Sequence, residues 1–266
     1  MRIKNLASLK KAASREIILA ELPETIRLTH FANAKAFKIN ELVRSIHQQS
    51  FEWYGFTLAL REAPELVIDL GLPVNEQNRE EYVSVEAEKI AAYRDSLPDH
   101  LIINGWIHSH GDLSYRHFSP TDATNQAVVL DYVTAGLRQP VAKVEIAIQD
   151  FVFLCQGSYR PEDLRRGSVS LITDSPVTRA SLWETVYGGF CYAIVIGDEG
   201  WHEQEIHYKR RGILTGQTSV GSKKDAELVL IDDGRLLTNS DIEMLGSEIS
   251  SKLSPVTSVP PKLESM

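Results

Sequence analysis

The sequence predicts an α/β fold, in which helices pack on a sheet and alternate with its strands along the chain. Residues 66–72 and 101–103 are apolar runs typical of buried strands. Between them, the polar residues 73–81 predict a loop, and residues 87–97 place apolar side chains at helical spacing up to the helix breaker Pro98. This alternation of strand, helix and strand favours an α/β class over an all-β class.

The part of the chain before these elements is predicted to supply a short helix, an extended region, a second helix and a strand. Residues 1–22 mix leucine and isoleucine with lysine and arginine, which favours an amphipathic helix that packs on its own domain, although such helices also bind membranes or partners. Residues 25–37 are predicted to form one long strand or a strand pair, and residues 39–49 a helix. Residues 51–60 alternate and are rich in aromatic side chains, which predicts a strand with Glu52 at its beginning.

The middle of the chain is predicted to continue the alternation and then to become irregular. A helix that includes Asp122 is expected to stop by Gly136. Residues 143–148 and 151–155 are predicted to be two strands joined by a tight turn. Residues 157–187 contain several glycine, proline, serine and arginine residues, so we expect a loop-rich insertion there.

The last part of the chain is predicted to contain a hairpin, a loop, a strand and a helix. Residues 190–196 and 201–208 flank a Gly-Asp-Glu-Gly turn, which predicts the hairpin. Residues 212–226 are rich in glycine, serine, threonine and lysine and are expected to form a flexible loop. Residues 228–237 predict a strand and a turn, and residues 240–253 a short helix.

Composition limits the classes of function. The chain has 266 residues, of which 43% are hydrophobic and 24% charged, values that are ordinary for a globular protein. Its formal net charge of -8 disfavours a nucleic acid as partner, because neutralising phosphates requires a basic face. We expect no membrane span, no secretory signal and a cytoplasmic location, and we expect Cys155 and Cys191 to be buried thiols rather than ligands.

The stretch that is most informative about function lies between the central strand and the helix that follows it. His108 and His110 are two residues apart at the strand end, so both side chains leave the same face. Ser119 and Pro120 are typical of a helix start, which places Asp122 in the first turn. Two imidazoles and a carboxylate can converge there on one metal ion, and three ligands leave a fourth position for water, as in a catalytic zinc site.

The spacing of these residues resembles the signature of the JAMM (MPN-plus) metalloproteases, which is His-x-His-Pro or Gly, seven residues, and Ser-x-x-Asp. Every fixed position of that signature is matched, by His108, His110, Gly111, Ser119 and Asp122. The family also carries a glutamate far upstream, at the end of its first helix or on the next strand, and Glu52 stands at the corresponding place. The likeness in element order covers roughly residues 24–210, and its specific motifs are Glu52 and residues 105–122.

The resemblance implies a fold, the MPN (cytidine-deaminase-like) sandwich, which is a curved mixed sheet flanked by helices. It divides the chain into an N-terminal appendage of residues 1–23, an MPN-like catalytic domain of residues 24–211 and a C-terminal extension of residues 212–266 with a disordered tail. JAMM enzymes carry an insertion at a place similar to residues 157–187, where it helps the ubiquitin-cleaving members hold their substrate. A surface excursion without function accounts for this composition equally well.

The resemblance also implies a chemistry. Zn2+ would be held by His108, His110 and Asp122, and would lower the pKa of its water from about 15.7 toward 7. Glu52 would act as the general base and would later return the proton to the leaving amine. The hydroxyl of Ser119 would donate a hydrogen bond to the oxyanion.

The implied function is that of a zinc-dependent isopeptidase or peptidase that hydrolyses the bond after a ubiquitin-like modifier, in deconjugation or precursor processing. The expected substrate is a ubiquitin-like protein or its conjugate, and family members often dimerise or need a partner subunit. Two alternatives are an MPN scaffold or binding subunit and an amidase that trims small carrier proteins. Scaffold members usually lack the ligands, so their presence favours the enzyme. We expect Trp106 to serve in packing and His117 to be a solvated loop residue.

Overall fold

The structure of the chain is a computed structural model that describes residues 16–78, 84–136, 139–147, 150–177 and 181–255. The contacts of the chain group into two units. Among the described residues, unit 1 consists of 16–21, 139–147, 150–177, 181–187 and 211–217. Unit 2 consists of 22–78, 84–136, 188–210 and 218–255.

Unit 2 is built on a mixed sheet with the strand order β12-β11-β10-β6-β2-β4. The central strand β6 runs parallel to β10 and antiparallel to β2. Seven of the nine residues of β6 are buried, and they include the polar residues Asn104, His108 and Ser109 as well as apolar ones. The bounds of the strands are β2 (Tyr54–Leu60), β4 (Asp69–Gly71), β6 (Leu101–Ser109), β10 (Leu182–Ile196), β11 (His202–Gly212) and β12 (Thr218–Lys223).

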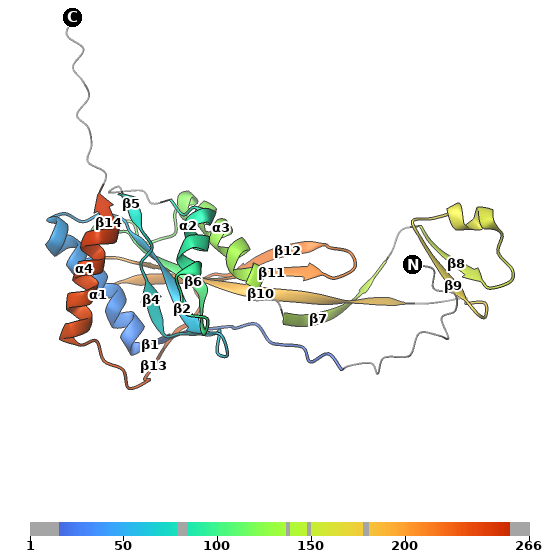
Figure 1. The fold of residues 1–266 in the computed structure, drawn as a ribbon, viewed down its shortest axis with the longest axis horizontal. Helices are drawn as coiled ribbons and strands as arrows, with labels where there is room; N and C mark the ends of the chain where they lie inside the picture. Colours follow the sequence, from blue (N-terminus) through green and yellow to red (C-terminus); the bar gives the residue numbers. More distant parts are fainter. Residues whose placement is uncertain (1–15, 79–83, 137–138, 148–149, 178–180, 256–266) are drawn as a thin grey trace, which may run out of the picture. The chain divides into compact units, whose positions relative to one another are not determined.

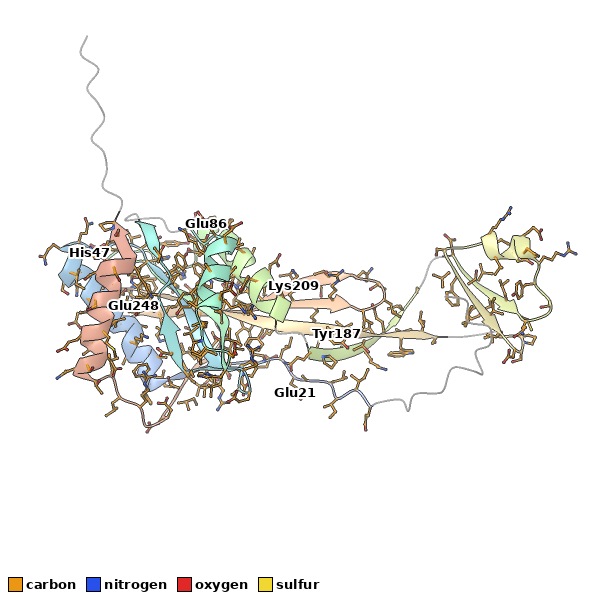
Figure 2. All side chains as sticks on the ribbon, viewed as in Figure 1. Glu21, His47, Glu86, Tyr187, Lys209 and Glu248 are labelled. Atoms are coloured by element: carbon orange, nitrogen blue, oxygen red, sulfur yellow. The ribbon has the colours of Figure 1, made fainter. Side chains whose placement is uncertain are left out.

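Helices cover both faces of this sheet, with α1 and α4 on one face and α2 and α3 on the other (Figure 1). Their bounds are α1 (His30–His47), α2 (Ala87–Asp95), α3 (Pro120–Gly136) and α4 (Asn239–Lys252). Figure 2 shows the side chains on these elements, with Glu248 on α4 and Glu86 just before α2. The sheet therefore lies between two helical layers.

Two apolar cores fill the two interfaces between sheet and helices. The core beneath α1 and α4 includes Trp53, Ile107 and Tyr192, and the core beneath α2 and α3 includes Tyr54 and Trp106. Neighbouring residues of one strand enter different cores because side chains alternate along a strand. Trp106 lies on the face of the sheet from which the imidazoles of His108 and His110 also project, two and four residues later.

A smaller sheet and a strand pair bring the end of the chain into unit 2. The small sheet has the order β13-β1-β3, in which β13 lies parallel to β1. A separate parallel pair joins β5 and β14. The bounds of these strands are β1 (Ile26–Thr29), β3 (Leu66–Val67), β5 (Asn75–Asn78), β13 (Leu228–Ile231) and β14 (Leu253–Pro255).

Unit 1 contains most of the region that was predicted to be an insertion. In it β8 and β9 form a parallel pair, and β7 pairs with β10. The carboxylate of Glu184 is buried and accepts hydrogen bonds from the backbone N–H groups of Leu214 and Thr215, at 2.9 and 3.0 Å. The bounds of the elements are β7 (Gln139–Ile146), β8 (Phe151–Cys155), the 3-10 helix η2 (Pro161–Arg165) and β9 (Val169–Thr173).

The predicted α/β class is confirmed, because mixed sheets are flanked by helices. The helix predicted over 87–97 is α2, and the strand predicted at 101–103 begins β6. The strands predicted at 190–196 and 201–208 are parts of β10 and β11, which are neighbours in the sheet.

The prediction of extended structure over 25–37 is wrong beyond Thr29, where α1 already begins. The hydroxyl of Thr29 accepts a hydrogen bond from the N–H of Ala32 at 3.1 Å, which caps the helix. The buried side chains of Phe31, Ala36 and other residues then follow at helical spacing. Apolar residues on the first turns of a buried helix were mistaken for a strand.

Three further predictions are wrong, one about strand pairing and two about loops that contain strands. The strands predicted at 143–148 and 151–155 do not pair with each other, since β7 pairs with β10 and β8 with β9. The predicted loop over 212–226 contains β12, and the predicted loop over 73–81 contains β5. The polar sequence of β12 suits its place at the edge of the sheet, where most of its residues are exposed.

The two ends of the chain also differ from the predictions. Residues 16–22 are not helical, and the rest of the predicted N-terminal helix lies outside the described residues, as do residues 256–266 of the predicted tail. The two units do not follow the predicted ranges 24–211 and 212–266, because β13 completes the small sheet with β1. Among the described residues, none of the helices has both the length and the apolar character required to cross a bilayer.

Gly105 lies on β6 between β10 and β2, where both neighbouring strands leave little room for a side chain. It is aligned with Tyr192 of β10 and with Thr57 of β2. A Cβ atom at this position would lie 2.4 Å from the carbonyl oxygen of Tyr192 and 2.8 Å from the Thr57 hydroxyl oxygen. Both distances are shorter than van der Waals contact, so only glycine allows this strand spacing.

We predict that Gly105→Ala lowers the free energy of unfolding by about 1–3 kcal/mol, the usual cost of overpacking a core. The matched control is Gly221→Ala on β12, where an added Cβ would have no atom within 4 Å. That control should keep or slightly raise stability, because alanine loses less backbone entropy than glycine on folding. Urea unfolding of both variants measures the difference, and equal stability of the two would contradict the prediction.

Candidate metal centre

The centre begins at the end of β6, where His108 and His110 point to the face covered by α2 and α3. Both residues are buried, with 0% and 2% of their surface exposed. His108 is the direct partner of Val195 on β10 and of Tyr54 on β2. The N–H of His110 donates to the carbonyl oxygen of Ile196 at 2.9 Å, so the backbone stays attached to β10 past the end of the strand.

The start of α3 supplies the carboxylate of the centre. The hydroxyl oxygen of Ser119 accepts a hydrogen bond from the N–H of Asp122 at 3.2 Å, and Oδ2 of Asp122 accepts one from the N–H of Ser119 at 2.7 Å. This reciprocal arrangement is a capping box, with Pro120 at the first helical position. The cap therefore fixes the direction of the Asp122 carboxylate as well as the helix start.

Three side chains turn their donor atoms toward one another at this place. The Nε2 atoms of His108 and His110 are 3.2 Å apart. Oδ1 of Asp122 lies 3.2 Å from Nε2 of His108, and Oδ2 lies 3.4 Å from Nε2 of His110. Within the described part of the chain these three residues form a buried group whose donor atoms can hold one metal ion.

The protonation of the three groups reflects their burial and their mutual contacts. Burial lowers the pKa of His108 below its usual value, and contact with Asp122 only partly opposes this effect. Burial also acts to lower the pKa of His110, but hydrogen bonds to Asp122 and the Tyr115 carbonyl, and the charge of Glu52, outweigh burial and raise the pKa. Burial acts to raise the pKa of Asp122, but contacts with both imidazoles outweigh it and lower the pKa. The centre thus attracts positive charge, as a cation site does.

Glu52 lies beside the three donors, on the segment that connects α1 to β2. The N–H of Ser109 donates to the carbonyl oxygen of Trp53 at 2.9 Å, so the pairing of β2 with β6 continues by one residue before Tyr54. Extending this register brings Glu52 opposite His110. The side chain is buried, and its Oε1 lies 4.0 Å from Nε2 of His110.

The motif glycine, Gly111, allows this segment to approach. It has a φ of +56°, and a Cβ atom there would lie 2.5 Å from the hydroxyl oxygen of Ser50. Its carbonyl oxygen accepts a hydrogen bond from the N–H of Asp198 at 2.9 Å. Oδ2 of Asp198 in turn accepts a hydrogen bond from the Ser50 hydroxyl at 3.1 Å. Gly111, Ser50 and Asp198 together fix the backbone two residues before Glu52.

The second ring nitrogens of the two histidines have different surroundings. Nδ1 of His110 donates to the carbonyl oxygen of Tyr115 at 2.9 Å, which leaves Nε2 with a lone pair for a ligand. Nδ1 of His108 is buried and has no hydrogen-bond partner among the residues that the structure describes. The ring of His108 instead stacks on Trp106, with centroids 4.4 Å apart.

The structure brings all five predicted site residues together, and it adds residues that the sequence did not indicate. The carbonyl of Tyr115 and the ring of Trp201, 6.0 Å from the ring of His110, lie beside that histidine, and Gln126 on α3 accepts a hydrogen bond from the indole that stacks on His108. Each comes from a loop or a helix face whose sequence has no distinctive spacing. His117 lies away from the donors; it is exposed and pairs with Glu203 at 3.0 Å.

No family model matches the sequence, and no curated protein matches it.

We predict that Asp122→Ala abolishes tight metal binding, because two histidines alone are too few ligands for a stable site. Asp122→Asn separates the loss of the helix cap from the loss of the ligand charge. Its amide oxygen can still accept the hydrogen bond from the N–H of Ser119, but it carries no charge. It should therefore keep most of the helix stability and still bind metal much more weakly. The measurement is metal content by mass spectrometry after dialysis against divalent ions.

The control for the metal-binding prediction is Asp131→Ala on the same helix. Asp131 is exposed and forms an ion pair with Lys209 at 2.6 Å, on the outer surface of α3. This variant should bind metal as the unaltered protein does. Stoichiometric metal retained by Asp122→Ala would show that Asp122 is not a ligand.

Proposed function

We propose that the protein is a zinc-dependent hydrolase of the JAMM isopeptidase type. The observation that carries the proposal is the close spacing of the donor groups. The two imidazole Nε2 atoms lie 3.2 Å apart, and the Asp122 carboxylate lies 3.2 Å from Nε2 of His108 through Oδ1 and 3.4 Å from Nε2 of His110 through Oδ2. In a tetrahedral zinc site with metal–ligand distances of about 2.0–2.1 Å, neighbouring ligand atoms lie about 3.3 Å apart. Each of these separations is close to that value, although the carboxylate presents a different oxygen to each imidazole, and one ligand atom of each residue lies within 4.8 Å of the others.

The type of donor also supports zinc in a catalytic role. Two imidazoles and one carboxylate form a ligand set that catalytic zinc uses, and three protein ligands leave one position open. Bound zinc would supply Lewis-acid activation of a water molecule and of the carbonyl group to be cleaved. The burial of the donors excludes bulk water and strengthens their electrostatic interactions.

Glu52 is the group that we assign to proton transfer. Its Oε1 lies too far from Nε2 of His110 for a direct hydrogen bond, at 4.0 Å, so the carboxylate stands beside the ligand group rather than within it. In that position it accepts the proton of the attacking water and returns it to the leaving amine. The Ser50 hydroxyl, which donates to the Asp198 carboxylate, and the N–H of Asp198, which donates to the Gly111 carbonyl, hold the segment that carries it.

Ser119 is assigned two roles that are compatible. Its oxygen accepts the hydrogen bond from the N–H of Asp122, as a helix cap. A hydroxyl can donate and accept at the same time, so its hydrogen remains for another acceptor. We assign it to the carbonyl oxygen of the substrate, on which negative charge develops during cleavage.

The substrate class rests on the resemblance of the motif to JAMM proteases, and we propose a ubiquitin-like protein followed by an amide bond. The test is a panel of fusions in which ubiquitin or a ubiquitin-like domain precedes a reporter protein. Zinc-loaded protein should release the reporter, and removal of zinc by a chelator should stop the release. Zinc-loaded protein that cleaves none of the fusions would contradict the substrate class but not the metal centre.

We predict that Glu52→Gln keeps bound zinc and lowers hydrolysis by at least about 10²-fold, because glutamine preserves size but accepts no proton. Rates are compared on one fusion at matched zinc content. Glu203→Gln is the control, since Glu203 pairs with the exposed His117 away from the donors. An unchanged rate for Glu52→Gln would remove this residue from the mechanism.

We predict that Ser119→Ala loses about 1 kcal/mol of stability through the cap and about 10²-fold in turnover through the oxyanion contact. Thr238→Ala is the matched control, because Thr238 caps α4 with the same hydrogen bond, from the N–H of Asp241 at 3.2 Å. The control should lose stability alone. If both variants keep full turnover at equal zinc content, Ser119 is only a cap.

A further inference from the structure

The ring of His108 has an unusual support for a metal ligand. Metal-binding histidines usually donate their second ring nitrogen to a carbonyl or carboxylate, which fixes the ring. His110 follows this rule through the carbonyl of Tyr115, at 2.9 Å. For His108, Nδ1 is buried and has no such partner among the described residues. The orientation of this ring must therefore depend on other contacts.

The largest of these contacts is the indole of Trp106. The rings of Trp106 and His108 are stacked, with an interplanar angle of 12° and centroids 4.4 Å apart. Both side chains are fully buried on the same face of β6. The ring of Phe118 lies on the imidazole at a tilt, with centroids 5.8 Å apart. A flat stack of this kind limits rotation of the imidazole about its χ2 angle.

Trp106 is itself fixed to the helix that carries the third ligand. Its indole N–H donates a hydrogen bond to Oε1 of Gln126 on α3, and both groups are buried. Gln126 lies four residues after Asp122, so the two side chains lie on the same side of the helix, one turn apart. One hydrogen bond thus joins the strand that carries His108 to the helix that carries Asp122.

We infer that Trp106 and Gln126 are positioning residues of the metal centre. The indole replaces the missing hydrogen-bond partner of His108 by stacking, and Gln126 sets the angle of the indole and its distance from Asp122. This inference rests on the proposed metal centre, but it does not depend on the identity of the substrate. It assigns to Trp106 a role beyond packing and to Gln126 a role that has no signature in the sequence.

The test is a double-mutant cycle on metal affinity. Gln126→Leu removes the acceptor, and Trp106→Phe keeps a stacking ring but removes the N–H donor. Each single variant should bind Zn2+ about 10-fold more weakly. This is the lower end of the loss in metal affinity that follows when a supporting contact of a ligand is removed. The double variant should also be about 10-fold weaker rather than about 100-fold, because both changes break one shared interaction. Competition with a chromophoric chelator measures the affinities.

Cobalt provides a readout that a purely structural role would not change. With Co2+ bound, the position and intensity of the visible absorption bands report the ligand geometry, and they should differ between Gln126→Leu and the unaltered protein. The matched control is Thr134→Val on α3, which removes a buried hydroxyl bonded to the carbonyl of Leu130 at 2.6 Å. This control should lose stability and keep both the zinc affinity and the cobalt spectrum.

The outcomes separate the inference from the function on which it rests. Protein that binds neither Zn2+ nor Co2+ would overturn the metal centre together with this inference. Normal binding by the unaltered protein, with affinity and spectrum unchanged in Gln126→Leu, would overturn the inference alone. Losses that multiply in the double variant would also overturn it, since the two residues would then act separately.

Discussion

The structure of the centre depends on one constraint, which is that two imidazoles and a carboxylate are buried together between the sheet and a helix. Buried polar groups cost free energy unless they are paired, and a buried charge costs more. The three groups meet this constraint by facing one another, and the cap of α3 fixes the carboxylate that both histidines share. The raised pKa of His110 and the lowered pKa of Asp122 follow from the same arrangement, in which the carboxylate favours positive charge beside it.

The topology of the sheet converts this local arrangement into a site. β6 is the central strand, and its end lies between β2 and β10 with helices on both faces, so residues just past it remain buried. The antiparallel pairing with β2 brings Glu52 beside His110, and the chain connection from β6 to α3 brings Asp122 back over the strand end. The two histidines thus come from the end of β6, Asp122 from the start of α3 and the assigned base from the segment before β2, and none of these parts could move without breaking strand pairing or a helix cap.

The sequence predicts the site better than the fold because the site uses local rules. Spacing by two on a strand and a cap sequence before a helix suffice to bring His108, His110 and Asp122 together, and both rules act over a few residues. Strand pairing acts over long distances, so the parallel partnership of β13 with β1 and the separation of β7 from β8 could not be read from the chain. The start of α1 was missed because Phe31 and its neighbours are apolar on a helix that is largely buried, and such a run does not distinguish helix from strand. The support of His108 by Trp106 and Gln126 was missed because it depends on which face of α3 meets β6.

The glycine of the motif, Gly111, determines the space available to a segment that is distant in sequence. Gly111 combines a positive φ with a Cβ position that the Ser50 hydroxyl nearly fills, so a larger residue there would displace the segment that leads to Glu52. The same segment is attached through Asp198 to the turn after β10 and so to the far side of the strand end. In this chain, the glycine after the second histidine therefore leaves space beside the carboxylate that we assign as base. The histidine pair and the upstream glutamate are then parts of one steric arrangement.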